Sequence, residues 1–237
     1  MPTPRRLPVR PAWPMTVLVA LLALLVTTGC SKKAKTTELP PGADLVSAGA
    51  TAMREVKTAH VVISAEGNVA DLPLRRADGV LTRSGDAKGS IQIEQLGTLI
   101  EYQFVVLGDT IHLKGVTGGW QELPAALAAQ IYDPSAILDP ERGVVQVLAT
   151  ATEARTEARE SVNGRDAYRV GVKLDRAAVA TLVPGVGEGV TGQLWFDTQA
   201  KQLIKAVLRV PGQGSAPGGT VTINVSDIDA PVTISAP

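Results

Sequence analysis

The fold class of this chain follows from the stretch Ile91-Gln92-Ile93-Glu94-Gln95-Leu96-Gly97-Thr98-Leu99-Ile100-Glu101-Tyr102-Gln103-Phe104-Val105-Val106. Apolar residues alternate with Gln and Glu in both halves of the stretch. Successive side chains of a strand point to opposite faces of a sheet, so this period of two predicts half-buried antiparallel strands.

The same alternation recurs along most of the chain. Clear strands are predicted at residues 60–66, 111–113, 168–174, 190–196, 204–210 and 221–225, and weaker ones at 72–81 and 153–161. Apolar residues at three- and four-residue intervals predict one amphipathic helix over residues 44–57. Residues 125–150 carry helix formers interrupted by Asp133-Pro134 and Asp139-Pro140, and 175–182 is a further short helical piece. The sequence therefore predicts an α+β fold with about ten strands and a few short helices.

A sheet of this size with one apolar face must curl around something. Either it closes over a solid core, or helices plug a half-open barrel and leave a cavity. Aromatic residues make up only 3% of the chain, so the interior is lined by small aliphatic side chains, which suit alkyl chains. The pattern alone leaves both arrangements open. The residues expected to point inward, and offered as the lipid-contacting set, are Val61, Ile63, Ile91, Ile93, Ile100, Phe104, Val106, Val170, Val172, Leu194 and Leu208.

The amino-terminal segment has the order of a bacterial lipoprotein signal. Arg5, Arg6 and Arg10 precede an apolar run over residues 17–26, and Gly29-Cys30 follows it. This run is about half of the ~20 residues that span a bilayer. We expect residues 1–29 to be the signal peptide, Cys30 to be acylated, 30–43 to be a tether and 44–237 to be a single lipid-binding domain. A retained membrane anchor and ordinary secretory cleavage are the alternatives.

The predicted processing limits what the mature chain binds. The signal peptide carries three Arg and no acid, so 23 basic and 23 acidic residues become 20 and 23, a net charge of −3. This balance argues against a nucleic-acid partner, which needs a clustered basic face. Cys30 is the only cysteine, so the predicted acylation leaves no thiol for a disulfide.

Residue patterns for catalysis or metal binding are weak. His60 and His112 occupy polar positions of two different strands with no acid at ligand spacing, which predicts surface histidines. Asp133, Asp139 and Glu141 suit helix capping better than a calcium loop. The sequence predicts no enzyme, no cofactor and no metal.

Several segments together resemble one known family. They are Lys57-Thr58-Ala59-His60, Trp120-Gln121-Glu122, residues 131–143, Val162-Asn163-Gly164-Arg165 and Pro231-Val232-Thr233-Ile234. In these segments the chain resembles the LppX/LprA/LprF/LprG lipoproteins of mycobacteria and other actinobacteria, and within that family most resembles its LprG branch.

The resemblance implies a strongly bent antiparallel sheet, a half barrel, with helices on the concave side enclosing an apolar cavity. It further implies a carrier of triacylated glycolipids or triacylglycerol that is anchored to the inner membrane, faces the periplasm and works with an efflux transporter. A secreted fraction of the protein is a further expectation. The main alternative is a scaffold lipoprotein that supports a transporter without carrying lipid. An enzyme acting on envelope lipids is the third hypothesis.

Overall fold

The computed structural model describes residues 38–69, 73–126, 134–183, 186–212 and 217–237. Residues Leu39–Pro237 form one compact unit, and the fold is described for that unit. Several predictions concern residues outside the described ranges: the signal peptide, Cys30, Asp133 and the first part of the segment 131–143 that resembles the family. The predictions made for them stay predictions.

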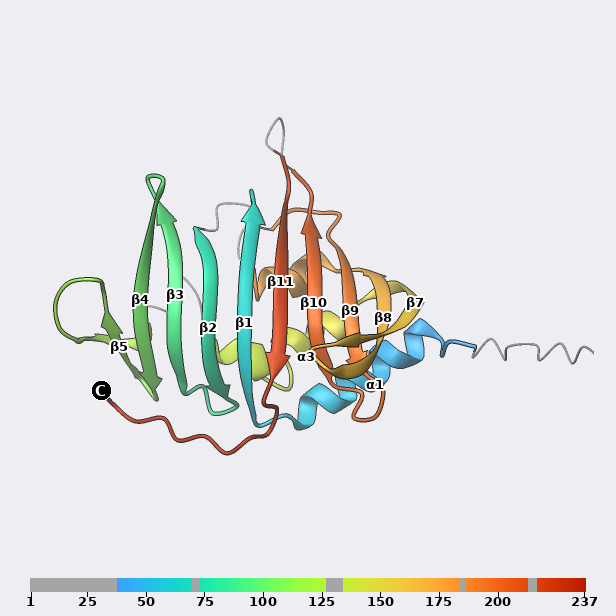
Figure 1. The fold of residues 1–237 in the computed structure, drawn as a ribbon, viewed down its shortest axis with the longest axis horizontal. Helices are drawn as coiled ribbons and strands as arrows, with labels where there is room; N and C mark the ends of the chain where they lie inside the picture. The colour runs from blue at the N-terminus through green and yellow to red at the C-terminus, as the bar shows by residue number, and fades with distance from the viewer. Residues whose placement is uncertain (1–37, 70–72, 127–133, 184–185, 213–216) are drawn as a thin grey trace, which may run out of the picture. The chain divides into compact units, whose positions relative to one another are not determined.

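Eleven strands of the described residues form one antiparallel sheet (Figure 1). The order across the sheet is β6-β5-β4-β3-β2-β1-β11-β10-β9-β8-β7, so the first and last strands of the chain pair at its centre. The two edge strands, β6 and β7, are not paired to each other, and the sheet is therefore open. The strands are β1 (Thr58–Gly67), β2 (Leu74–Thr82), β3 (Ala87–Gln95), β4 (Thr98–Leu107), β5 (Thr110–Lys114), β6 (Gln121–Pro124), β7 (Thr152–Val162), β8 (Arg165–Lys173), β9 (Thr191–Asp197), β10 (Leu203–Val210) and β11 (Gly219–Ser226).

The strand predictions from alternation are confirmed within a few residues at their ends, including the two weaker ones, which form β2 and β7. Strand β6 was not predicted. It has only four residues, all of them exposed, and ends at Pro124. So short a segment shows no periodicity that the sequence could reveal.

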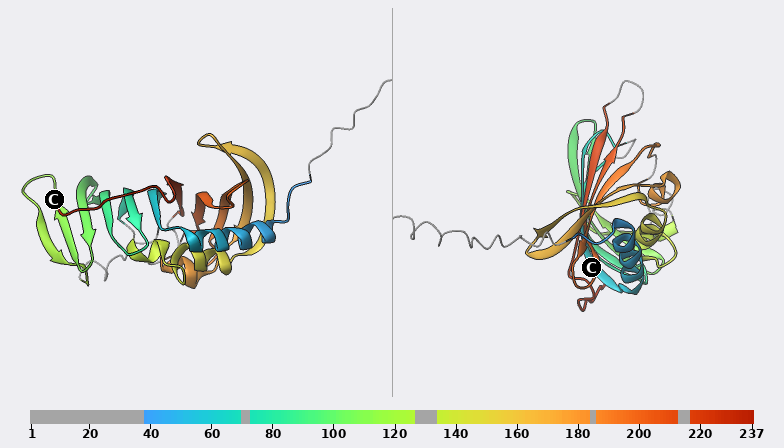
Figure 2. Two further views of the ribbon diagram at one scale, coloured as in Figure 1. Left: turned by 90° about the horizontal axis from the view of Figure 1, so that it is seen from below. Right: turned by 90° about the vertical axis from the view of Figure 1, so that its right-hand side faces the viewer.

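The helices lie on one face of the sheet (Figure 2). They are α1 (Gly42–Glu55), the 3₁₀ helix η1 (Pro134–Leu138), α3 (Gly143–Ala149) and α4 (Arg176–Ala180). Helix α1 begins two residues before the predicted start, and α4 begins at Asp175, whose side chain accepts a hydrogen bond from the Ala178 N–H at 2.9 Å.

Helix α1 approaches the sheet closely at one glycine. A Cβ atom added to Gly49 would lie 2.2 Å from a ring carbon of Phe196 on β9. Phe196 is completely buried. Glycine at position 49 therefore lets the helix backbone pack directly against the aromatic ring.

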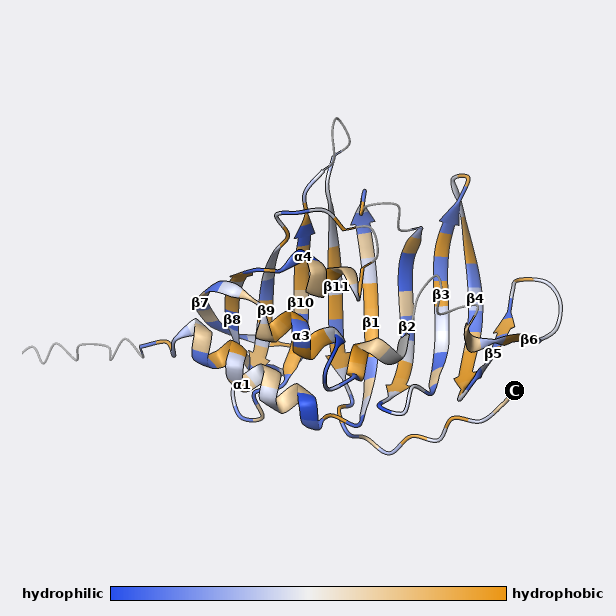
Figure 3. Cartoon of the chain, turned by 180° about the vertical axis from the view of Figure 1, so that it is seen from behind, coloured by the Kyte–Doolittle hydropathy of each residue, from blue (hydrophilic) through white to orange (hydrophobic). Residues whose placement is uncertain are grey.

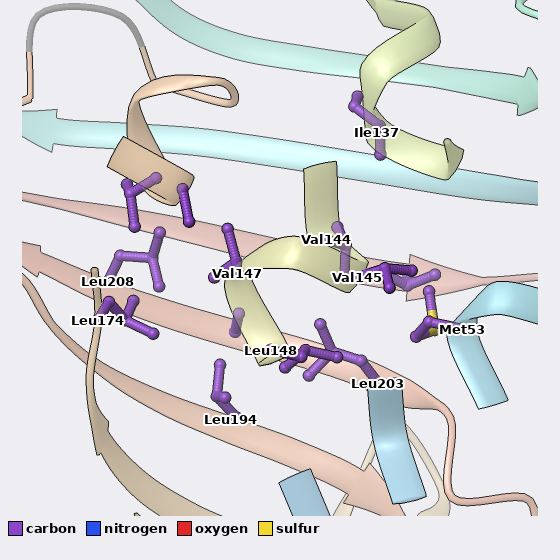
Figure 4. Close-up of a cluster of buried hydrophobic side chains, with 14 of the residues drawn as sticks. Met53, Ile137, Val144, Val145, Val147, Leu148, Leu174, Leu194, Leu203 and Leu208 are labelled. Carbon is purple, nitrogen blue, oxygen red and sulfur yellow. The ribbon is translucent and has the colours of Figure 1, made fainter. Parts of the chain in front are cut away.

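The main core lies between these helices and the strands beneath them (Figure 4). Met53 from α1 and Val145 and Leu148 from α3 pack over Leu194 and Leu203 of the sheet, and all five are less than 5% exposed. These aliphatic side chains hold the helices on the β8–β11 part of the sheet.

The β7–β8 end of the sheet curls strongly, as Figure 2 shows. On the face without helices, Ala167, Trp195 and Ile204 form a second, smaller cluster of buried residues, with Val162 and Val207 packed against it. The fold is thus a large, curved, open antiparallel sheet with a few helices, as the sequence and the resemblance predicted, and it is not a closed barrel.

Candidate functional site

The register of the strands brings the proposed lipid-contacting residues to one face. Residues paired directly across neighbouring strands share a face. One such row crosses eight strands, from β4 through β1 to β8, and consists of Tyr102, Ile91, Ala77, Ile63, Ile223, Ala206, Leu194 and Val170. By the same pairing and the period of two, all eleven residues of the set lie on the face that carries the helices.

The structure divides this set into two parts. Six of its members are closed off in the core, each with 8% exposure or less: Val61, Val106, Val170, Val172, Leu194 and Leu208. The other five are half-buried: Ile63, Ile91, Ile93, Ile100 and Phe104. Burial in a close-packed core leaves no room for a ligand, so the half-buried members are the accessible ones.

Coverage by the helices explains this division. Among the described elements, α1 contacts β7, β8 and β9, and η1 contacts β2. Figure 3, which views the helix side, shows β3 and β4 without a described helix in front of them. Their apolar residues therefore stay partly open to solvent.

We call the half-buried apolar residues on the helix side of strands β2 to β5 the open apolar face. It consists of Ala77, Ile91, Ile93, Ile100, Tyr102, Phe104, Ile111 and Leu113, on strands β2 to β5. None of these side chains is charged. A contiguous apolar surface of this kind marks an interaction site more often than a scattered exposed leucine does.

An aromatic ring covers the backbone in the middle of the open apolar face. Gly79 and Gly89 pair directly across β2 and β3, and Phe104 pairs with Gly89 from β4. A Cβ atom added to Gly79 would lie 3.3 Å from Phe104 Cζ. The ring thus lies over Gly79.

The opposite face of β1, β2 and β11 carries a group of hydrogen-bonded polar side chains. His60 Nε2 lies 2.8 Å from Asp78 Oδ1, and His60 Nδ1 lies 3.1 Å from Ser226 Oγ. Arg76 donates to Asp78 Oδ2 at 2.7 Å. The hydrogen bond from His60, assisted by Arg76 and opposed by partial burial, holds the pKa of Asp78 below its usual value. These groups link β2, β1 and β11 across the sheet.

The prediction of two surface histidines is only partly right. His60 is half-buried, whereas His112 is only 8% exposed and its Nδ1 lies 3.7 Å from Glu122 Oε1. Glu122 belongs to β6, which pairs with the strand of His112 and shows no alternation that would predict it. The His60 partner was missed because Asp78 is on a neighbouring strand, where spacing along the chain gives no signal.

The predicted capping role of Asp139 is wrong for α3, because the N-cap position of that helix is Arg142 and no side chain caps it. Asp139 Oδ1 accepts hydrogen bonds from the backbone N–H groups of Glu141 at 2.8 Å and Arg142 at 3.1 Å, just before α3. The bond from Glu141, with help from Arg142, lowers the Asp139 pKa against the opposing effect of burial. The described residues hold no group of three or more His, Cys, Asp or Glu side chains suited to a metal ion. None of their helices combines the length and apolar character needed to cross a membrane.

An open, curved antiparallel sheet with helices on one face places the chain among proteins built on one large sheet. The match to one family is direct. The chain belongs to the LppX_LprAFG lipoprotein family, whose model matches residues 41–234.

Relatives of known name agree with this assignment. The lipoarabinomannan carrier protein LprG of Mycolicibacterium smegmatis is 31% identical over 236 residues, covering 96% of this chain and 98% of the relative. The putative diacylated glycolipid transporter LprF of Mycobacterium bovis is 28% identical over 238 residues, covering 93% of this chain and 90% of the relative.

Solved structures show the same fold. The crystal structure of LprF from Mycobacterium bovis matches with a TM-score of 0.71 and 25% identity, covering 83% of this chain and 96% of LprF. The crystal structure of the Mycobacterium tuberculosis lipoprotein LppX matches with a TM-score of 0.61 and 19% identity, covering 81% of this chain and 97% of LppX. The predicted family is therefore confirmed.

Proposed function

We propose that this protein is a membrane-anchored carrier that binds the acyl chains of triacylated glycolipids or triacylglycerol against the open apolar face. It moves them across the periplasm toward the outer envelope and works with an efflux transporter. The single observation that carries this proposal is the uncharged, half-buried face of β2–β5, which continues along one row of side chains into the closed core. The names of the LprG and LprF relatives support the lipid class.

The energetics of transfer explain why such a face is useful. An acyl chain of ~16 carbons costs about 12 kcal/mol to expose to water, at about 0.8 kcal/mol per CH₂. A lipid therefore crosses an aqueous gap slowly unless a protein covers its chains. Aliphatic and aromatic side chains such as Ile91, Ile93 and Phe104 supply apolar contact without directional bonds, so they accept alkyl chains of different length.

The proposal includes the anchor. Acylation of Cys30 attaches the carrier to the inner membrane, facing the periplasm, and residues 30–43 give the domain from residue 44 on a tether. Two acyl chains on one residue satisfy the two-signal requirement for stable attachment.

Native mass spectrometry of the chain without its signal peptide, expressed in an actinobacterial host and purified gently, tests the binding. We expect adducts with the mass of multiply acylated lipids. Ile91→Glu places a carboxylate on the open apolar face and should remove them. Gln92→Glu places the same group on the opposite face and should retain them. A parent protein free of lipid, or equal adducts in both variants, would favour the scaffold alternative.

A further inference from the structure

The turn between β3 and β4 contains a leucine where the backbone favours another residue. Gln95 pairs with Thr98, so Leu96 and Gly97 form a two-residue loop. Their φ angles are 52° and 77°, and positive φ at both positions defines a type I′ turn. Asn, Asp and Gly adopt this left-handed conformation readily, whereas a bulky residue such as leucine is strained in it.

The same chain contains the ordinary version of this turn. Asn163 and Gly164 connect β7 and β8 with φ angles of 52° and 78°, between the directly paired Val162 and Arg165. Asn-Gly is the sequence that a type I′ turn prefers. Leucine at the equivalent place in the β3–β4 turn is thus not required by the hairpin geometry.

Leu96 gains nothing from packing that would compensate for its strain. Its exposure is 101%, and the nearby Leu99 is 61% exposed. A Cβ atom added to Gly97 would meet no other atom within 4 Å, so the turn projects into open space (Figure 1). A strained side chain with no contact in its own protein points to a contact with something else.

The apex itself carries no charge. Residues 95–100 carry no ionisable side chain. Of the nearest acids, Glu94 is paired with Arg75 at 2.7 Å and Glu101 accepts a hydrogen bond from Gln92 at 2.9 Å. The hydrocarbon region of a bilayer excludes charged groups and accepts leucine, and this apex meets that requirement.

We propose that Leu96 and Leu99, at the apex of the β3–β4 hairpin, insert into the acyl region of a lipid bilayer. A projecting apex with two leucines offers far less than the ~800 Å² that each partner of a stable protein interface buries, whereas a fluid bilayer accepts it without a complementary surface. Ile93 and Ile100, which lie two cross-strand pairs further from the turn than Gln95 and Thr98, belong to the open apolar face. The inserted apex therefore brings the end of that face to the membrane, and this last step rests on the proposed function.

Fluorescence on vesicles tests the insertion. Residues 31–237 are attached through an amino-terminal His tag to phosphatidylcholine vesicles containing a nickel-chelating lipid, and a polarity-sensitive fluorophore is placed at Gln95→Cys. We expect a blue shift for the parent and at least a tenfold lower inserted fraction for Leu96→Asn. Val116→Asn is the matched control, because Val116 is 78% exposed on the loop between β5 and β6.

Stability and lipid content separate the possible results. Asparagine suits the left-handed conformation, so Leu96→Asn should raise the unfolding midpoint by about 2 °C while it reduces insertion. Its native mass spectrum should keep the lipid adducts of the parent, because Leu96 lies outside the open apolar face. Absence of a blue shift in the parent, or equal insertion of parent and Leu96→Asn, would overturn the proposal whether or not lipid adducts are present.

Discussion

Enlargement of Ile91 distinguishes an open apolar face from a packed core. Ile91 and Val170 lie in the same cross-strand row, but Ile91 is half-buried and Val170 is completely buried. In a close-packed core, added side-chain volume costs typically about 1–3 kcal/mol. We expect that cost for Val170→Phe. For Ile91→Trp we expect less than about 1 kcal/mol, since the larger ring extends into the uncovered space beside Tyr102.

The assay combines unfolding in urea with lipid analysis. Denaturation of both variants gives the change in free energy of unfolding, and native mass spectrometry of the same preparations gives the bound lipid. Ile91→Trp should fold nearly as stably as the parent and retain less lipid, because the ring occupies surface that acyl chains need. The reasoning is refuted if Ile91→Trp is destabilised as strongly as Val170→Phe, or if it retains lipid at the level of the parent.

Three further changes test the fold and the anchor. Asp197 accepts hydrogen bonds from two backbone N–H groups and pairs with Arg165 at 2.9 Å; Asp197→Ala should cost about 1–3 kcal/mol at pH 7 by urea denaturation. Burial raises the pKa of Asp197, but the backbone hydrogen bonds and Arg165 outweigh burial and lower that pKa below 3.8. The stabilisation is therefore present above pH 3.8 and should be lost as the pH falls through the lowered pKa. If the parent and Asp197→Asn differed in free energy of unfolding as much at pH 2 as at pH 7, this explanation would be contradicted. Gly49→Val should strongly lower the thermal unfolding midpoint measured by calorimetry, because the added Cβ would collide with the Phe196 ring. An unchanged unfolding midpoint would mean that α1 moves away from the ring at little cost. Cys30→Ala should release the protein from the membrane fraction or leave the signal uncleaved, and membrane attachment with normal processing at residue 30 would disprove acylation there.

Alternation along the chain was sufficient to predict most strands and the face of most apolar residues. Ile204 is an exception, because a register shift between Leu203 and Lys205 places it on the face without helices. Ile91 and Leu194 were assigned to one face from period two alone, and the register joins them through Ala77, Ile63 and Ala206. Whether each residue is accessible could not be predicted, because that depends on where helices pack. The short segments at η1 and α3 give no sequence signal for the strand that they cover.

Interactions between strands were the other gap. His60 and Asp78 are 18 residues apart and meet only because β1 and β2 pair in one register. The strain at Leu96 was equally invisible, since it follows from a two-residue loop whose ends the sequence does not fix. Asn163-Gly164 marks its turn by composition, whereas Leu96-Gly97 does not.

The division of the helix side into a covered and an open part has a consequence for the proposed carrier. The covered part, with Phe196 and Leu148 at its centre, supplies buried apolar contacts that do not depend on a ligand. Its stability therefore remains when lipid leaves, and a bound lipid adds only the stabilisation set by its concentration relative to its dissociation constant. If the whole helix side were closed, release of the chains would require the helices to separate from the core. Because no described helix covers β3 and β4, the proposed exchange needs only the transfer of acyl chains between this face and another apolar phase, and the core can stay folded during binding and release.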